Sequence, residues 1–402
     1  MNALRRDWSA GALRRQFAIE DAAPVLGMSP SFINRVLGER STRLTLKDVL
    51  LLLDQDSFSE TFVPRSSVPS YLLAQQEAAQ VERAVPRDAH ELTLGDSVSL
   101  IGSLPDASIQ CVVTSTPYWG MRLYDKSFER TWADGETCPF GNEQTPEGFI
   151  RHSVEVLFHI KRTLTKSASV WWNLMDTFNT RTQIRTNAAE TLRAMQGKDE
   201  RGWKDHACRR YSAGHAYLKD GEQCVIPAQV AQRASRLGYY LKSIITWKKN
   251  GSLPETVETR VTREQESILH FAVDRAPLFV KGAFLTHAES LGGRNRRYEA
   301  EKLTDVWHFS TAAGQDGHGA QFPLALPARC ISLSTKRGDL VLDPFVGSGT
   351  ASVAAKLLER RSVGFDISEK YLKTARRRLN EHHVGPSAAT SDPEQTQQAT
   401  LL

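Results

Sequence analysis

The sequence has 402 residues, of which 40% are apolar, and a formal net charge of +5. This length and apolar content allow one large α/β domain and a smaller one, while the weak positive charge alone does not decide whether the chain binds nucleic acid. The first 17 residues hold four arginines and no apolar run, which excludes a signal peptide or membrane span there. The five cysteines lack the spacing of a metal motif. We therefore expect a cytoplasmic protein without a bound metal and without a membrane partner.

Two short helices are predicted near the N-terminus. Helical periodicity runs from Ile19 to Leu26, Gly27 interrupts it, and Ser29 can cap a second helix that has an apolar face. This pattern is typical of a helix-turn-helix, in which the second helix contacts DNA. Three polar residues of that helix would then face the duplex: Ser31, Asn34 and Arg35. A small helical domain that binds no DNA gives the same pattern, so both interpretations stay open.

Composition divides the chain into four parts. They are a helix-turn-helix-like domain over 1–65, a linker and helix over 66–90, a large α/β domain over 91–380 and a disordered tail over 381–402. Serine and proline are frequent between Ser57 and Ser70, which indicates a linker, and a helix is expected from Tyr71 to Val85. The tail has few apolar residues, so it cannot bury a core.

The apolar run from Cys111 to Val113 predicts a buried parallel strand, which leads into the loop Ser115-Thr116-Pro117-Tyr118. Open α/β sheets bind ligands outside the carboxyl ends of their strands. This loop offers carbonyl oxygens, a hydroxyl and an aromatic ring, which suit a flat polar substrate. A tyrosine after a strand is often only a core aromatic, but beside Ser-x-Pro that interpretation is weaker. The sequence therefore predicts the first half of a binding site.

The second half-site is predicted in the loop that follows the apolar run from Leu340 to Leu342. Gly347 and Gly349 allow a ligand to approach the backbone closely, and the helix after Thr350 presents free N–H groups to an anion. A later strand ends in Asp366, whose carboxylate can accept hydrogen bonds from both hydroxyls of a ribose. These features indicate a ligand that contains a nucleoside. Any βαβ unit needs small residues at its tight turn, so this loop alone is a weak signal.

Together the two loops resemble those of the amino-group DNA methyltransferases that use S-adenosylmethionine. The catalytic loop of that family reads Ser/Asp/Asn-Pro-Pro-Tyr/Phe, and its cofactor loop is similar to Asp343-Pro344-Phe345-Val346-Gly347-Ser348-Gly349-Thr350. The catalytic loop comes first in this chain, as in the permuted beta class. The resemblance implies an α/β, permuted Rossmann-like methyltransferase fold with a mostly parallel twisted sheet. One departure is Thr116, which keeps the backbone carbonyl of the usual proline but loses its fixed φ.

The resemblance also implies roles for particular residues. The catalytic residues would be Ser115, Thr116, Pro117 and Tyr118. The cofactor-binding residues would be Asp96, Phe322, Pro323, Asp343, Pro344, Phe345, Gly347, Ser348, Gly349, Thr350 and Asp366. A late loop that closes on the target base would contact DNA through Trp247, Lys248 and Lys249. Base recognition would come from insertions near 181–220 and 274–319, and the candidate DNA contacts in the second are Arg294, Arg296 and Arg297. A solvated charged surface is an equal interpretation of these arginines.

The implied reaction is methyl transfer to an exocyclic amine of a flipped base in duplex DNA. The Ser115 hydroxyl and the Thr116 carbonyl would accept the two amine hydrogens, and Tyr118 would stack on the base. In the resembling enzymes a serine at the first position mostly accompanies N4-methylcytosine, so we expect a site-specific, cytosine-N4-specific DNA methyltransferase. N6-adenine methylation is the alternative reaction, and a non-catalytic DNA-binding regulator is the alternative of another class. A companion restriction endonuclease and a homodimer stay open as partners.

Overall fold

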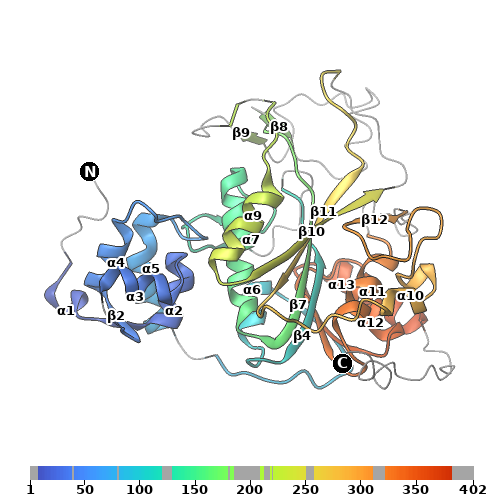
Figure 1. Cartoon of the computed structure of the whole chain (residues 1–402), viewed down its shortest axis with the longest axis horizontal. Coiled ribbons are helices and arrows are strands. Elements are labelled where there is room, and N and C mark those ends of the chain that lie inside the picture. The colour runs from blue at the N-terminus through green and yellow to red at the C-terminus, as the bar shows by residue number, and fades with distance from the viewer. Residues whose placement is uncertain are drawn as a thin grey trace, which may run out of the picture.

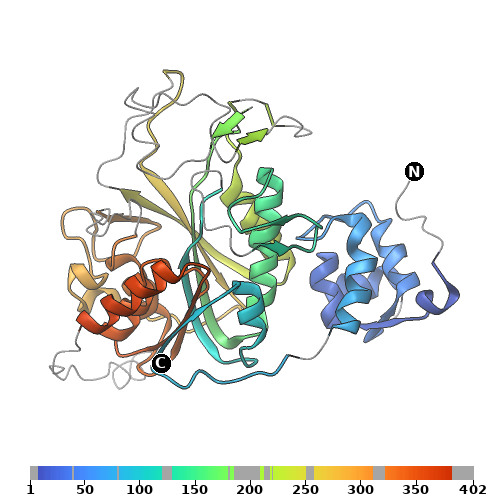
Figure 2. The same cartoon turned by 180° about the vertical axis from the view of Figure 1, so that it is seen from behind.

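The computed structural model describes residues 8–38, 40–78, 81–119, 129–179, 182–184, 209–211, 218–219, 221–249, 258–310 and 322–382. In this part of the chain, a small helical domain lies beside an α/β domain that is built on one large sheet (Figures 1 and 2). The tail beyond 382, the loop at 250–257 and most of the insertion at 181–220 lie outside the described residues.

The N-terminal domain consists of short helices and a two-stranded sheet. Its elements are α1 (Ala10–Leu13), β1 (Gln16–Ala18), α2 (Ile19–Leu26), α3 (Pro30–Leu37), β2 (Arg43–Thr45), α4 (Leu46–Leu53) and α5 (Val68–Glu77). The predicted helix pair is confirmed. Gly27 ends α2 with a left-handed φ of 66°, and the Ser29 hydroxyl caps α3 by accepting a hydrogen bond from the Phe32 N–H at 3.2 Å.

The three polar residues of α3 have different surroundings. Ser31 and Arg35 are exposed, whereas the Asn34 side-chain oxygen accepts a hydrogen bond from the Ser41 N–H at 3.0 Å. This bond holds the loop that follows α3 against the helix. Contact between α3 and DNA stays a prediction.

The segment between the two domains is not the linker that its composition indicates. Within the range Ser57 to Ser70, Phe62 and Val63 are fully buried. The Phe62 ring lies 4.8 Å from the ring of Phe158 in α7 (Pro146–Lys161), so this segment joins the cores of the two domains. The serine and proline content indicates a linker, but the packing depends on two apolar side chains, which an average composition does not single out. Helix α5 correspondingly begins and ends earlier than predicted.

The α/β domain contains an eight-stranded sheet with strand order β12-β10-β11-β7-β4-β13-β14-β3. The strands are β3 (His90–Leu94), β4 (Ile109–Ser115), β7 (Leu164–Leu174), β10 (Tyr240–Lys249), β11 (Gln265–Ala272), β12 (Val306–Phe309), β13 (Leu340–Asp343) and β14 (Arg361–Asp366). Neighbouring strands are parallel except at β11, which runs antiparallel to both β10 and β7. All strands of this sheet except β11 therefore end at the same side, which we call the carboxyl edge.

Helices cover both faces of the sheet, as Figures 1 and 2 show. One face is covered by α6 (Ser97–Gly102), α7 and α9 (Ile226–Arg236), and the other by α11 (Ala325–Ser334), α12 (Thr350–Leu357) and α13 (Glu369–Glu381), with the short α10 (Ala283–Thr286) beside α11. Because β4 and β13 are buried on both faces, they read in the sequence as continuous apolar runs. The predicted α/β class and mostly parallel sheet are confirmed.

Further short strand pairs lie outside the large sheet. Strands β5 (Arg130–Thr131) and β6 (Thr137–Cys138) form a hairpin before α7, and β8 (Thr182–Ile184) pairs with β9 (Arg209–Tyr211). None of the helices that the structure describes has the length and apolar character of a membrane span.

Candidate functional site

The catalytic loop begins at the carboxyl edge, where β4 ends in Ser115. Strand β4 pairs with β7, and this pairing places Ser115 opposite Asn173. The N–H of the buried Thr116 donates a hydrogen bond to the Asn173 carbonyl at 3.3 Å. A proline at this position would have no N–H. The hydrogen bond to β7 therefore anchors the loop, which lacks the fixed φ that a proline would give it.

A polar cluster that includes the buried Asn173 and Glu266 surrounds the hydroxyls of this loop. The Tyr118 hydroxyl donates to the carboxylate of Glu266 in β11. The side-chain amide of Asn173 donates to Glu266 Oε2 at 2.7 Å, and its nitrogen lies 3.1 Å from the Tyr118 hydroxyl and 3.2 Å from Ser115 Oγ. At the end of β10, Lys249 Nζ lies 2.7 Å from Glu266 Oε1, and its side chain is only 16% exposed. We call these five residues the tyrosine cluster. Sequence reasoning missed Glu266, an isolated acidic residue outside any motif.

The late-loop residues of β10 have different environments. The prediction that Trp247 contacts DNA is wrong: its side chain is 2% exposed, and its Nε1–H donates to the Phe309 carbonyl at 3.0 Å. Side chains alternate between the two faces of a strand, so the neighbouring Lys248 points the other way and is half exposed. The resemblance placed both residues in one loop, whereas the strand continues through them to Lys249.

The cofactor loop follows β13 at the carboxyl edge. Gly347 and Gly349 have left-handed φ values of 52° and 80°. A Cβ on Gly349 would lie 2.6 Å from the Cβ of Ala375 in α13, whereas a Cβ on Gly347 would meet no atom within 4 Å. Packing against α13 therefore requires glycine at 349, and Gly347 borders open space that a ligand can occupy.

Two carboxylates lie beside this loop. Asp343 Oδ1 accepts hydrogen bonds from Thr114 Oγ1 at 2.6 Å and from the Phe345 N–H at 3.1 Å, and Oδ2 has no hydrogen-bond partner among the described residues. Burial raises the pKa of Asp343 to about 7. Asp366 accepts a hydrogen bond from the Gly347 N–H at 2.8 Å, and burial raises its pKa to about 6. A buried carboxylate oxygen that lacks a partner, beside an open glycine turn, fits the ammonium group of S-adenosylmethionine.

Other parts of the cofactor loop are held by the protein itself. Arg378 of α13 donates hydrogen bonds to Ser348 Oγ at 2.8 Å and to Thr350 Oγ1 at 3.0 Å. The Pro344 carbonyl accepts a hydrogen bond from Ser97 Oγ of α6 at 2.5 Å. These contacts tie the loop to helices on both faces of the sheet, so the hydroxyls of Ser348 and Thr350 help to fix the shape of the loop. Their contact with the cofactor stays a prediction.

The remaining predicted cofactor residues flank this loop. Asp96 caps α6 by accepting a hydrogen bond from the Ser99 N–H at 2.8 Å, and it forms an ion pair with Arg130 at 2.9 Å. Phe322 and Pro323 are half-buried just before α11. Their contact with a cofactor stays a prediction.

A second cluster of ionisable side chains lies where the hairpin of β5 and β6 meets α7. The potential ligand atoms of Glu136, Cys138 and His152 lie within 4.8 Å of one another, so this group could hold a metal ion. The two ring nitrogens of His152 are each 3.2 Å from a carboxylate oxygen, one of Glu143 and one of Asp134. Burial alone would lower the pKa of His152, but hydrogen bonds with Asp134, Cys138 and Glu143 raise it to about 11. These hydrogen bonds therefore favour the charged form of the His152 ring. The expectation of no metal stays a prediction.

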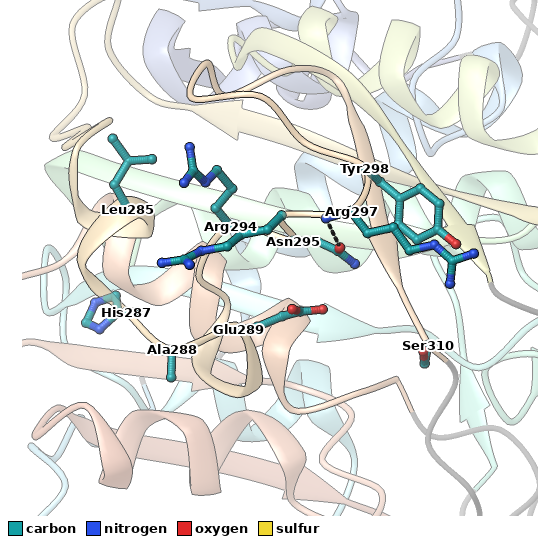
Figure 3. A pocket seen from close by; sticks show the side chains of 10 residues that line it. Leu285, His287, Ala288, Glu289, Arg294, Asn295, Arg297, Tyr298 and Ser310 are labelled. Atoms are coloured by element: carbon teal, nitrogen blue, oxygen red, sulfur yellow. Dashed lines mark hydrogen bonds between the residues drawn. The ribbon is translucent and has the colours of Figure 1, made fainter.

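Three arginines of the second insertion line one pocket of about 570 Å³ (Figure 3). They are Arg294, Arg296 and Arg297. Ser310, which also lines the pocket, follows β12, so one side of the pocket lies at the carboxyl edge. The buried Arg329 holds the loop that carries these arginines. It donates hydrogen bonds to Glu299 and to the carbonyls of Gly292 and Gly293, each at 2.6 Å. The arginines therefore project from an anchored backbone.

Cofactor affinity should depend on Asp366. We expect Asp366→Ala to weaken binding of S-adenosylmethionine by about 1–3 kcal/mol, the scale of a lost charge-assisted hydrogen bond. Isothermal titration calorimetry on the folded variant measures this change. Glu369→Ala is the control, because Glu369 is an exposed carboxylate at the start of α13 and should leave the affinity unchanged. Unchanged affinity for Asp366→Ala would remove Asp366 from the site.

Known proteins resemble this chain over most of its length. The family model described as "DNA methylase", N6_N4_Mtase, matches residues 109–377. Type II methyltransferase M.Cfr9I of Citrobacter freundii is 31% identical over 75% of this chain and 91% of its own length. Type II methyltransferase M.SmaI of Serratia marcescens is 28% identical over 72% of this chain and 90% of its own length.

A solved structure shows the same fold. The PvuII DNA methyltransferase (cytosine-N4-specific) superposes with a TM-score of 0.51 at 18% identity, over 72% of this chain and 88% of that protein. The match to the family model covers well over half of the chain and includes both the catalytic and the cofactor loop. The chain therefore belongs to the N6/N4 DNA methylase family, the amino-group DNA methyltransferases that use S-adenosylmethionine.

Proposed function

We propose that this protein methylates the N4 amine of a flipped cytosine at a specific site in duplex DNA. The observation that carries the proposal is the 2.6 Å hydrogen bond between Thr114 Oγ1 and Asp343 Oδ1. It joins the strand that leads into the catalytic loop to the strand that leads into the cofactor loop. Neighbouring strands lie about 4.8 Å apart, so a base beside Ser115 would be next to a cofactor at the glycine turn.

The reaction requires activation of a weak nucleophile. The lone pair of the base amine is delocalised into the ring, and the bound cofactor supplies the electrophilic methyl group. The Ser115 hydroxyl and the Thr116 carbonyl can accept the two amine hydrogens, which localises the lone pair on nitrogen. A base can enter this site only after it has left the duplex, and the ring of Tyr118 offsets part of the unstacking cost.

Two observations favour cytosine. Ser115 occupies the first position of the catalytic loop, where serine mostly accompanies N4-methylcytosine in the enzymes that this chain resembles. The PvuII enzyme, which shares the fold, is named as cytosine-N4-specific. N6-adenine methylation is the second candidate, because the matching family includes both kinds of enzyme. The name Type II methyltransferase on M.Cfr9I and M.SmaI supports a role beside a restriction endonuclease.

The arginine pocket supports DNA binding at the carboxyl edge. Strand β12 is four positions from β4 in the sheet order, which corresponds to a separation on the order of 20 Å between this pocket and Ser115. Duplex DNA rises about 3.4 Å per base pair, so a phosphate about six base pairs from the target could lie in the pocket. We propose that the pocket binds the DNA backbone on the side of the target base opposite the cofactor.

Removing the three arginines should weaken DNA binding and flatten its salt dependence. Each lost phosphate contact reduces the slope of log K against log salt by about 0.9. We therefore expect the triple alanine variant of the arginine pocket to lower the slope by up to about 3, with unchanged affinity for S-adenosylmethionine. Fluorescence anisotropy with duplex DNA at several salt concentrations measures it. The matched control removes three exposed arginines elsewhere: Arg83, Arg337 and Arg376. An equal loss in both triple variants would mean that the pocket contributes only net charge.

Analysis of the reaction product tests the proposed function. The full chain is incubated with unmethylated genomic DNA and labelled S-adenosylmethionine, and the DNA is digested to nucleosides. We expect the label in N4-methyl-2′-deoxycytidine. Label in N6-methyl-2′-deoxyadenosine would support the second candidate. Absence of label in DNA, with the cofactor bound, would overturn the proposed activity.

A further inference from the structure

Glu266 lies in β11, outside the motif of the catalytic loop, yet its carboxylate takes part in the hydrogen-bond network of that loop. Its side chain is 6% exposed, and its ion pair with Lys249 spans 2.7 Å. A buried ion pair contributes little net stability, because the desolvation of both charges offsets their attraction. Net stability therefore does not explain a buried carboxylate at this position, and its contacts with the catalytic loop are the remaining explanation.

The carboxylate fixes the direction of the hydrogen bonds around it. An ionised carboxylate can only accept, so the Tyr118 hydroxyl must donate its hydrogen to Glu266. The Tyr118 oxygen is then available as an acceptor for the Ser115 hydroxyl, whose oxygen lies 3.3 Å away. Ser115 Oγ accepts a hydrogen bond from the Asn173 amide at 3.2 Å and keeps a second lone pair. That lone pair is the one that can accept a hydrogen from the target amine.

We propose that Glu266 is the terminal proton acceptor of the methyl transfer, and that it acts through Tyr118 and Ser115. The chain would run from the base amine to Ser115 Oγ, from the Ser115 hydroxyl to the Tyr118 oxygen, and from the Tyr118 hydroxyl to Glu266 Oε2. This proposal rests on the proposed function and names a group that the function requires, because an amine that gains a methyl group must lose a proton.

The proton balance closes within the chain of residues. The bond from the methyl carbon to the cofactor sulfur breaks with its electron pair on sulfur, and the amine lone pair forms the new bond to carbon. One amine proton passes to Ser115 Oγ while the Ser115 proton passes to the Tyr118 oxygen. The Tyr118 proton passes to Glu266 Oε2. The methylated amine and both hydroxyls end neutral, and Glu266 ends as a carboxylic acid that returns its proton to water before the next turnover.

Lys249 gives the carboxylate a defined orientation. The ammonium group lies against Oε1, so Oε2 faces the Tyr118 hydroxyl and the Asn173 amide. These three groups come from β10, the catalytic loop and β7, and they are the polar partners of Glu266 in the described part of the chain. Asn173 is a positioning residue in this scheme, because its amide fills the other lone pair of Ser115 Oγ.

Glu266→Gln tests the direction of the chain without changing its shape. The glutamine amide can donate to the Tyr118 oxygen, which reverses that hydrogen bond and removes the proton acceptor. We expect the single-turnover methylation rate to fall on the order of 100-fold, as for loss of general base catalysis. Cofactor affinity, DNA affinity and the fluorescence of 2-aminopurine at the target position should stay within threefold of wild type, because none of these requires proton transfer.

Tyr118→Phe tests the same chain without removing a buried charge. The ring remains for stacking, so base flipping should be retained, and the rate should fall by a similar factor. The double variant should be no slower than the slower single variant, because both changes interrupt one chain. The wild-type rate should fall in heavy water, and this solvent isotope effect should change in both variants.

Glu264→Gln is the matched control. Glu264 precedes β11 and faces Lys248 at 3.9 Å, but both side chains are about half exposed, so the rate should equal that of wild type. Near-normal rates in Glu266→Gln and Tyr118→Phe would overturn the relay. So would a rate loss accompanied by an equal loss of DNA affinity and an unchanged isotope effect, which is the pattern of a purely structural residue. If wild type itself methylates no base, the proposed function fails and not the relay.

Discussion

Ser115→Ala should lower the single-turnover rate by about 100-fold or more and leave binding of S-adenosylmethionine unchanged. The substitution removes a preorganised acceptor for the amine, and loss of one such electrostatic partner commonly costs 100-fold or more in turnover. It also breaks the path by which the amine proton leaves. The hydrogen bonds of Ser115 go to Tyr118 and Asn173, so the cofactor loop should keep its shape.

Quench-flow measurement of labelled DNA gives the rate, and calorimetry gives the cofactor affinity. Ser108→Ala is the matched control: Ser108 lies just before β4 at the opposite end of the strand, where its hydroxyl donates to the Pro105 carbonyl at 2.8 Å. The control should retain the wild-type rate. A full rate in Ser115→Ala would remove this hydroxyl from the mechanism, whereas loss of cofactor binding would place it in the cofactor site instead.

The two half-sites were predictable because each is local in the sequence. A buried parallel strand appears as an apolar run, and its loop follows at once, so the apolar runs alone place Ser115 and Asp343 at strand ends. The structure brings these ends together through the neighbouring strands β4 and β13. Their juxtaposition therefore follows from the fold that the resemblance implied.

The rest of the site depends on pairing between strands that are distant in sequence. Glu266 reaches Tyr118 because β11 inserts between β7 and β10, and no local pattern specifies that order. The error at Trp247 has the related cause that a motif position does not reveal which face of a strand a side chain occupies. The anchor of Thr116 was equally hidden in the sequence, because the hydrogen bond from its N–H to the Asn173 carbonyl exists only in the folded sheet.

His152→Phe should lower the free energy of unfolding by about 3–5 kcal/mol, the usual cost of removing one partner from a buried ion pair. The aromatic ring can keep its stacking on Trp132, whose ring lies 4.2 Å away and almost parallel. Phenylalanine cannot bind the carboxylates of Glu143 and Asp134, which would remain buried with uncompensated charge. The substitution should also loosen the cofactor loop, because Phe140, which lies between β6 and α7, stacks on Phe345 of that loop at 4.9 Å.

The matched control is His270→Phe in the core beside β7. The His270 ring stacks on Trp171 at 3.8 Å and makes one hydrogen bond, to Ser169 Oγ at 3.1 Å. Burial lowers the pKa of His270 to about 3, so this ring is neutral and its replacement removes no charge. Urea unfolding at pH 6 should therefore show a loss of about 1–2 kcal/mol for His270→Phe, smaller than the loss for His152→Phe.

The pH dependence of these losses has opposite signs and identifies the charged ring. Burial opposes protonation of His152, but its hydrogen bonds with Asp134, Cys138 and Glu143 raise the folded pKa to about 11, so its stabilisation is complete below pH 6.5 and is lost as pH rises toward 11. The cost of His152→Phe should thus shrink by at most about 1.4 kcal/mol per pH unit between pH 6.5 and pH 9. His270, with its lowered pKa, instead destabilises the wild type below pH 6.5, because unfolding releases a ring that takes up a proton. Equal losses for His152→Phe at pH 6 and pH 9 would show that the His152 ring is neutral, and that its neighbouring carboxylates are compensated by another cation.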